Sequence, residues 1–576
     1  MKNLAYTEKS QFINPRLSEH SHVMEQKIYK IGENIYSAVG YALNYPTMIV
    51  GDDGIILVDA SETIGSMEEI MKEFRKITDL PVKAFILTHN HGDHWGGMTA
   101  CVSQQESDNG SVLVVGHEEL VKNVAQSSSE LLDIRMGRAV WMYGNLLPKG
   151  EHGAVNLGLG PVLDKGITRF VTPNTIVNSN ETFSLTVSGV EMEIFFVESE
   201  AADEIAVYFK KEKVLHVAEV LQGESFPNIY TVRGQTRDAK KWYKAVETLR
   251  TYHPDSIVGC HIRPLEGKEA CEKLLSDYGD AIQYAHDQTV RLLNQGNTIE
   301  AIMDEIGTLP PHLFQADRMG EFYGTFRQAV RAIYDNYLGW FNGEPTALNP
   351  ISATEASKRY IKLMGGRENV LMAAQQSLED KEYEWASELA SHLVRIDFND
   401  ITARQVKATA CRMMGYASEN ATWRNWYLTC AIELEGAFEE IVKHMGTNGG
   451  FPPFSESFLD VSTYNMLEAM KVKLNGPKTF GTNMAVKCNI EGECFVLQIR
   501  KGVLQVHGPH EIYTEKLDCE CTVSHVMFAK LMAKDVTPCD ANQSGDLQVS
   551  DEKILSEFFN CFDAFTPFVD MPFCFQ

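Results

Sequence analysis

The feature that most restricts how this chain can fold is the segment THNHGDHWGG, residues 88–97, which directly follows the short apolar run VKAFIL. Such a run is typical of a buried strand, and three histidines and an aspartate at its end indicate a metal site. In extended backbone, residues two apart project to the same side, so His89 and His91 can bind one ion. The glycine turn that follows directs Asp93 and His94 toward a second position. These side chains suit Zn²⁺ or a similar divalent ion, and a surface or core histidine cluster is the alternative interpretation.

The chain of 576 residues divides into three zones by pattern. The first alternates short apolar strands with amphipathic helices, which is typical of layered sheets covered by helices. Helical spacing of apolar residues dominates the second zone, and the Gly- and Pro-rich stretch 446–456 is a predicted linker to an α+β pattern. We therefore expect an α/β catalytic domain over 1–275, an all-α domain over 276–445 and an α+β domain over 446–576.

Composition narrows the class of partner. The formal net charge is −26, and a chain this acidic repels phosphate backbones, so we expect no nucleic-acid partner. The 12 cysteines are scattered without a C-x-x-C pair, which favours reduced thiols in an intracellular protein. No signal-peptide core and no apolar run of about 18 residues is evident, so we expect a cytoplasmic protein without a membrane span.

Several further segments carry a resemblance to a known family. Residues 88–97 are similar to the signature of the metallo-β-lactamase superfamily, and nearly the whole chain resembles the linear alkylsulfatases. The narrower resemblance rests on VESEAADE (197–204), AEV (218–220), NIYTVRGQTRDAKKW (228–242), RAIYDNYLGWFNGEPTALNP (331–350) and ENATWRNWYLTCA (419–431). It implies an αββα sandwich, an all-α dimerisation domain and a C-terminal α+β domain like sterol carrier protein. The implied activity is zinc-dependent hydrolysis of alkyl sulfate esters to alcohol and inorganic sulfate by a metal-activated water, with aryl sulfates left open.

The same resemblance extends the metal site to residues elsewhere in the chain. It implies two zinc ions per chain, bridged by Glu219. The remaining ligands that it implies are His89, His91 and Glu200 for one ion, and Asp93, His94 and His261 for the other. Two divalent ions carry four positive charges, and the three carboxylates carry three negative ones. The site is therefore near neutral and can still acidify a bound water.

Two arginines lie between Glu219 and His261, in the segment TVRGQTR. The resemblance assigns sulfate binding to Arg233, whose planar guanidinium can donate to two oxygens and supplies the local cation that an anionic alkyl sulfate needs in an acidic chain. Arg237 either shares this role or pairs with its neighbour Asp238. Arg233, Glu219 and Asp93 are the expected catalytic residues.

Two departures from the family pattern lie near this site. Residues 220–228 read VLQGESFPN, with Val220 where asparagine is usual, and SEAADE (199–204) lacks the usual proline. Both bear on substrate choice and rate. The alternatives that stay open are a hydrolase of the same fold acting on a phosphoester, lactone or thioester, and a lipid-binding or assembly protein with a relict metal site. The sequence also leaves open whether water attacks sulfur or carbon.

The helical zone contains the aromatic segment YGTFRQAVRAIYDNYLGWFNG (323–343). Exposed aromatic surfaces are typical of protein interfaces, so we expect a homodimer formed through this zone. An ordinary helical core is the alternative interpretation.

Overall fold

The computed structural model describes residues 11–127, 131–438, 440–441 and 462–563. Among these, 11–121 and 138–440 form one compact unit, and 122–137 together with 441–563 form a second. The linker predicted at 446–456 lies outside the described residues. None of the helices in the described ranges has the length and apolar character that crossing a lipid bilayer requires.

The first unit contains a seven-stranded sheet whose strands follow one another in chain order. The first four strands pair antiparallel, and the fourth to the seventh pair parallel. The strands are β1 (Lys27–Ile31), β2 (Ile35–Val39), β3 (Thr47–Val50), β4 (Ile55–Val58), β5 (Val82–Ile86), β6 (Leu113–His117) and β7 (Thr175–Val177). Strand β4, IILV, is buried along its whole length, as expected for a strand covered on both faces.

A six-stranded sheet follows, with the order β15-β14-β11-β10-β9-β8. Its pairings are antiparallel except for the parallel pair β11 and β14. The strands are β8 (Phe183–Val187), β9 (Val190–Phe196), β10 (Ile205–Phe209), β11 (Val214–His216), β14 (Ser256–Val258) and β15 (Leu265–Glu266). A separate short hairpin is formed by β12 (Tyr230–Thr231) and β13 (Gln235–Thr236).

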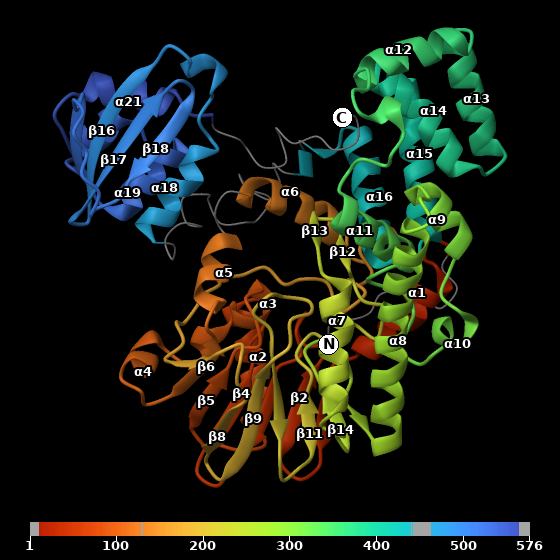
Figure 1. The fold of residues 1–576 in the computed structure, drawn as a ribbon, viewed down its shortest axis with the longest axis vertical. Coiled ribbons are helices and arrows are strands. Elements are labelled where there is room, and N and C mark those ends of the chain that lie inside the picture. The colour runs from red at the N-terminus through yellow and green to blue at the C-terminus, as the bar shows by residue number, and fades with distance from the viewer. Residues whose placement is uncertain (1–10, 128–130, 439, 442–461, 564–576) are drawn as a thin grey trace. The chain divides into compact units, whose positions relative to one another are not determined.

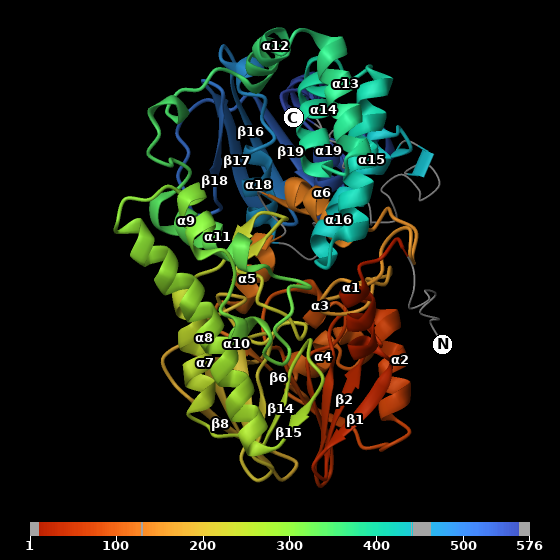
Figure 2. The same ribbon diagram turned by 90° about the vertical axis from the view of Figure 1, so that its right-hand side faces the viewer.

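The two sheets pack face to face and are covered by helices on their outer faces (Figures 1 and 2). Ile86 of the first sheet and Ile194 of the second lie in the same buried cluster between them. Phe74 of α2 packs on the outer face of the first sheet, and Trp242 of α7 on that of the second. The helices up to residue 250 are α1 (Pro15–His20), α2 (Ile64–Phe74), α3 (Gly92–Trp95), α4 (Gln104–Asp108), α5 (Leu120–Ser127), α6 (Leu132–Tyr143) and α7 (Ala239–Arg250). This arrangement confirms the predicted αββα sandwich.

From residue 268 onward, the regular elements that the structure describes in the first unit are helices. They are α8 (Lys268–Leu293), α9 (Ile299–Ile306), α10 (Pro311–Phe314), α11 (Phe326–Leu338), α12 (Ala353–Leu363), α13 (Arg367–Glu379), α14 (Tyr383–Ile396), α15 (Ile401–Ala417) and α16 (Ala421–Leu434). The aromatic segment 323–343 divides between two environments. Phe326 and Tyr334 of α11 are buried in the core shared with α7 and α8, whereas Trp340 beyond its end is 73% exposed. The all-α character predicted for this zone is confirmed.

The second unit is built around a five-stranded sheet of order β18-β17-β16-β19-β20. Its strands are β16 (Asn483–Ile490), β17 (Glu493–Arg500), β18 (Val503–His507), β19 (Cys519–Val523) and β20 (Leu547–Val549). Its helices within 462–563 are α18 (Thr463–Lys471), α19 (His525–Ala533), α20 (Pro538–Ser544) and α21 (Glu552–Asn560). Met470, Phe495 and Phe528 meet in its core. The predicted α+β pattern is confirmed, while the likeness to sterol carrier protein stays a prediction.

Candidate metal centre

The candidate site lies where several strands of the two sheets end. His89, His91, Asp93 and His94 follow the end of β5, with the last two on the single turn α3. Glu200 follows β9, Glu219 follows β11 and His261 follows β14. Strands β9, β11 and β14 run in the same direction within their sheet, so their carboxyl ends meet at one edge. Tertiary packing therefore gathers ligand-type side chains from four separate segments.

The two glycines that end the segment 88–97 allow α3 to lie close to the start of α2. A Cβ atom on Gly96 would lie 2.3 Å from the carbonyl oxygen of Glu62, and one on Gly97 would lie 2.6 Å from Cβ of Met67. Any larger residue would push α3, with Asp93 and His94, away from this position. The glycines are thus required by close backbone approach.

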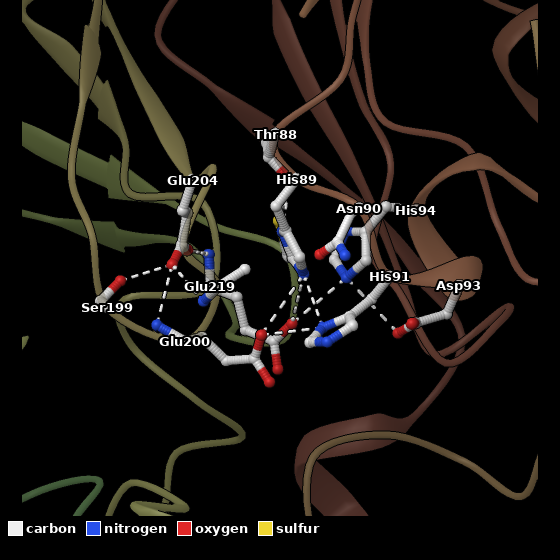
Figure 3. A network of polar contacts seen from close by, with 12 residues as sticks. Thr88, His89, Asn90, His91, Asp93, His94, Ser199, Glu200, Glu204 and Glu219 are labelled. Atoms are coloured by element: carbon white, nitrogen blue, oxygen red, sulfur yellow. Dashed lines mark hydrogen bonds and ion pairs between the residues drawn. The ribbon is translucent and has the colours of Figure 1, made fainter. Parts of the chain in front are cut away.

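The first group of the cluster is formed by two histidines and a glutamate (Figure 3). Nδ1 of His91 lies 3.0 Å from Nε2 of His89 and 2.8 Å from Oε2 of Glu200. Oε2 of Glu200 is 3.6 Å from Nε2 of His89. With Glu219, the possible ligand atoms all lie within 4.8 Å of one another, which is close enough for one ion to contact them all.

The second group contains Asp93, His94 and His261. Oδ2 of Asp93 lies 3.5 Å from Nε2 of His94 and 3.4 Å from Nε2 of His261. Oε2 of Glu219 joins the two groups, since it lies 3.2 Å from His94, 3.4 Å from His261 and 3.3 Å from His89. The structure thus brings together all seven residues that the sequence analysis selected as ligands.

These residues fit a divalent cation. Glu200, Glu219, His89, His94 and His261 are each at most 3% exposed. Within the described residues, neither Oε2 of Glu200 nor Nε2 of His261 takes part in a hydrogen bond, although both atoms are buried. Buried polar atoms without hydrogen bonds are costly, and imidazole nitrogen with carboxylate oxygen is a donor set that divalent metals prefer. The cluster therefore supports binding of a divalent metal.

The protonation states of the histidines differ. Burial and the charge of Arg233 lower the pKa of His91 to about 3, so its imidazole is neutral at neutral pH. Burial also works against the charged form of His94, but Asp93 and Asp59 outweigh it and raise its pKa well above the ordinary value. Glu219 outweighs burial in the same way and raises the pKa of His261. Binding of an ion must therefore compete with protons for these two imidazoles.

One residue that the sequence analysis missed fixes the orientation of His94. Asp59 follows β4, and its Oδ2 accepts a 2.8 Å hydrogen bond from Nδ1 of His94. The same carboxylate accepts hydrogen bonds from the backbone N–H and the hydroxyl of Thr88, at 2.8 and 2.7 Å. This contact turns Nε2 of His94 toward the cluster, as such partners do for metal-binding histidines. The available signal was an aspartate directly after a fully apolar strand.

A second missed residue lies inside the altered segment 220–228. Nε2 of Gln222 donates to Oε1 of Glu219 at 2.9 Å, and its Oε1 accepts from the backbone N–H of Asn228 at 2.8 Å. Gln222 is fully buried, and Val220 is packed in the adjacent core. The altered segment is thus tied to the cluster through the oxygen of Glu219 that does not face the histidines.

The two arginines have different environments. Arg237 is 4% exposed, forms an ion pair through Nη2 with Oε1 of Glu200, and donates to the carbonyls of Glu200 and Asn228 at 2.8 and 2.6 Å. The predicted alternative, a pair between Arg237 and Asp238, is wrong. The Asp238 side chain instead caps α7 and accepts from the backbone N–H groups of the first turn. Arg237 belongs to the support of Glu200 because both side chains are buried together.

Arg233, by contrast, points to the cluster from a half-buried position. Its Nη2 lies 3.5 Å from Nε2 of His91, and within the described residues it forms no ion pair. Burial works against its charge, but Tyr143, Tyr323 and the nearby carboxylates outweigh burial and hold its pKa above the ordinary value. A permanent cation therefore lies beside the candidate metal positions.

The fold and this cluster together define a protein of the metallo-β-lactamase superfamily with a site for divalent metal. The model of the metallo-beta-lactamase superfamily matches residues 43–261, that of alkyl sulfatase dimerisation 298–437, and that of the alkyl sulfatase C-terminal domain 455–570. A linear primary-alkylsulfatase of a Pseudomonas species is 37% identical over 466 residues, which are 80% of this chain and 88% of that protein. The chain belongs to the alkylsulfatase family.

More distant relatives extend over almost the whole chain. An alkyl/aryl-sulfatase of Saccharomyces cerevisiae is 27% identical over 96% of this chain and 85% of that protein. Among solved structures, a stereoselective inverting sec-alkylsulfatase of a Pseudomonas species superposes with a TM-score of 0.86 at 26% identity, covering 98% of this chain and 89% of that one. The predicted family, fold class and enzyme class are confirmed.

Proposed function

We propose that this protein hydrolyses alkyl sulfate esters to an alcohol and inorganic sulfate at a centre of two zinc ions. His89, His91 and Glu200 would bind one ion, and Asp93, His94 and His261 the other. The observation that carries the proposal is the position of Glu219, whose single oxygen Oε2 lies 3.2 to 3.4 Å from histidines of both groups. A carboxylate oxygen so placed is suited to bridge two adjacent cations.

The chain's own residues supply binding and charge. Arg233 would donate to two oxygens of the sulfate group, and it provides a local cation in a chain of net charge −26. Divalent ions, when bound, would lower the pKa of a coordinated water to about 7 and withdraw charge from the sulfate oxygens. Asp93 and Glu219 would hold that centre in place through their carboxylates. Arg237 keeps Glu200 in position and is not directed to the substrate.

The proposal is tested by incubating zinc-loaded protein with a panel of C4 to C12 alkyl sulfates and aryl sulfates. The measured quantity is the inorganic sulfate that is released. The same protein is assayed on phosphate monoesters, lactones and thioesters, which are the alternative substrates. We expect sulfate release, and we expect that Arg233→Met loses it because the anion loses its cation. A panel without sulfate release, or turnover only of an alternative ester, would contradict the proposal.

Reaction in ¹⁸O-labelled water separates attack at carbon from attack at sulfur. Label in the alcohol indicates attack at carbon, and label in the sulfate indicates attack at sulfur. Zinc and the count of two are tested by elemental analysis of the purified protein, where fewer than about one ion per chain would contradict a two-ion centre.

We further propose that the chain forms a homodimer through its helical zone. Large apolar side chains are exposed on this zone, among them Trp340 at 73%, Leu363 at 82% and Met372 at 59%. Exposed apolar surface of this kind marks interaction sites, and the alkyl sulfatase dimerisation model matches this zone. Sedimentation at micromolar concentration should give a dimer for the natural chain and a monomer for the pair Trp340→Lys and Leu363→Lys. A monomeric natural chain would refute the proposal.

A further inference from the structure

Glu204 is a buried acidic residue whose side chain contacts the backbone of two residues of the metal cluster. It immediately precedes β10 and has no exposed surface. Its Oε1 accepts a 2.7 Å hydrogen bond from the backbone N–H of Glu219. Its Oε2 accepts from the backbone N–H groups of Glu200 and Ala201 at 3.0 and 3.4 Å, and from the hydroxyl of Ser199 (Figure 3).

These contacts join two loops that the sheet does not hold in register. Glu200 lies beyond the end of β9 and Glu219 beyond the end of β11, so neither residue is part of a strand pairing. Each backbone N–H needs an acceptor because both residues are buried. A single carboxylate supplies one oxygen to each loop and fixes the distance between them.

The arrangement requires a carboxyl group, because each of its two oxygens accepts from a backbone N–H group of a different loop. Both of its oxygens accept hydrogen bonds, whereas the amide of glutamine has one accepting oxygen and a donating NH₂ group. The NH₂ group would face an N–H donor of one loop or the other. An aspartate is one methylene shorter and cannot reach both loops at once.

We propose that Glu204 is a positioning residue that holds Glu200 and Glu219 in ligand geometry before a metal ion binds. The inference rests on the proposed metal centre, but it concerns metal affinity and loop order and not the reaction. Partners behind metal ligands typically change metal affinity by about 10- to 100-fold when they are removed.

The test compares Glu204→Gln and Glu204→Asp with the natural chain in two measurements. The first is zinc affinity, from competition against a chromophoric chelator. The second is the visible spectrum of the Co²⁺-loaded proteins. We expect a loss of affinity of about 10- to 100-fold in both variants, with an altered Co²⁺ spectrum. Glu321→Gln is the control, because Glu321 is a half-buried carboxylate that accepts from the backbone N–H of Phe326 at 2.7 Å, outside the cluster. It should change zinc affinity less than about twofold. Unchanged affinity and spectrum in both Glu204 variants would overturn the proposal.

Hydrogen exchange on the natural chain needs no variant and covers the case in which Glu204→Gln and Glu204→Asp fail to fold. In chelator-treated protein, the amides of Glu200 and Glu219 should be protected to an extent similar to those of β10. Fast exchange of both amides, with β10 still protected, would overturn the proposal. Sulfate release is assayed separately, so a natural chain that binds zinc without hydrolysing sulfate esters would contradict the proposed function and leave the result on Glu204 standing.

Discussion

Replacing Arg237 by methionine tests the support of Glu200 most directly. The guanidinium makes three contacts: the ion pair with Glu200 and hydrogen bonds to the carbonyls of Glu200 and Asn228. Methionine keeps much of the volume and removes every donor. Glu200 would then lose its ion-pair partner, and two carbonyl oxygens would lose the donors that the guanidinium supplies.

The expected cost follows from these contacts. Removing one partner of a buried ion pair costs about 3–5 kcal/mol. Each of the two buried carbonyls adds about 1 kcal/mol, so the metal-free first unit should lose about 6 kcal/mol of unfolding free energy. With an unfolding entropy of about 2.1 cal/mol/K per residue over the roughly 410 residues of this unit, that loss lowers the thermal midpoint by about 7 °C. Zinc supplies a new cation for Glu200, so metal-saturated Arg237→Met should recover about 3 kcal/mol of the loss.

The assay is thermal unfolding of the full chain in chelator and in excess zinc. Arg233→Met is the matched control, because Arg233 lies in the same site and makes no ion pair within the described part of the chain. It should lose sulfate release while its metal-free midpoint stays within a few degrees of the natural chain. A metal-free Arg237→Met protein as stable as the natural chain would refute the reasoning, since the ion pair with Glu200 could not then exist in solution.

Three further predictions concern the site and its core. Because the pKa values of His94 and His261 are raised, zinc competes with protons for these two side chains. The zinc affinity should therefore rise by at least about tenfold from pH 6 to pH 8, and proton release on zinc binding should be measurable in weak buffer. A pH-independent affinity would contradict this. Gln222→Leu leaves Oε1 of Glu219 and the N–H of Asn228 without partners, and it should lower stability by about 2–4 kcal/mol and weaken zinc binding in chelator competition. Unchanged zinc affinity would show that Glu219 is held by other contacts. Trp242→Ala removes a fully buried indole that packs against the second sheet. It should lower the unfolding free energy of the first unit by about 3–5 kcal/mol, measured by denaturant unfolding. A loss below about 1 kcal/mol would contradict that packing.

The local part of the candidate site could be read from the sequence. His89, His91, Asp93 and His94 lie within six positions after a buried strand, so their proximity is fixed by the local backbone. The three zones followed equally from patterns of apolar residues, because strand and helix periodicity are properties of short segments. The domain bounds 1–275, 276–445 and 446–576 stay predictions.

The distant ligands could not be found by local reasoning. Glu200, Glu219 and His261 stand in unremarkable segments, and the resemblance to a family selected them before the structure placed them beside His89 and His94. Zinc, the count of two ions and the dimer stay proposals, since they depend on atoms and chains beyond this one.

The sequence by itself determined the kind of chemistry, through a dense metal-ligand segment at the end of a buried strand, and the order of the three zones. Only the tertiary structure decided which polar residues support that chemistry: Arg237 pairs with Glu200 and not with Asp238, Asp59 orients His94, and Glu204 accepts hydrogen bonds from two loops. The physical reason is that a ligand spacing or an amphipathic helix is encoded within a few neighbouring positions. The partner of a buried charge is instead selected by how distant strands end at the same edge of a sheet.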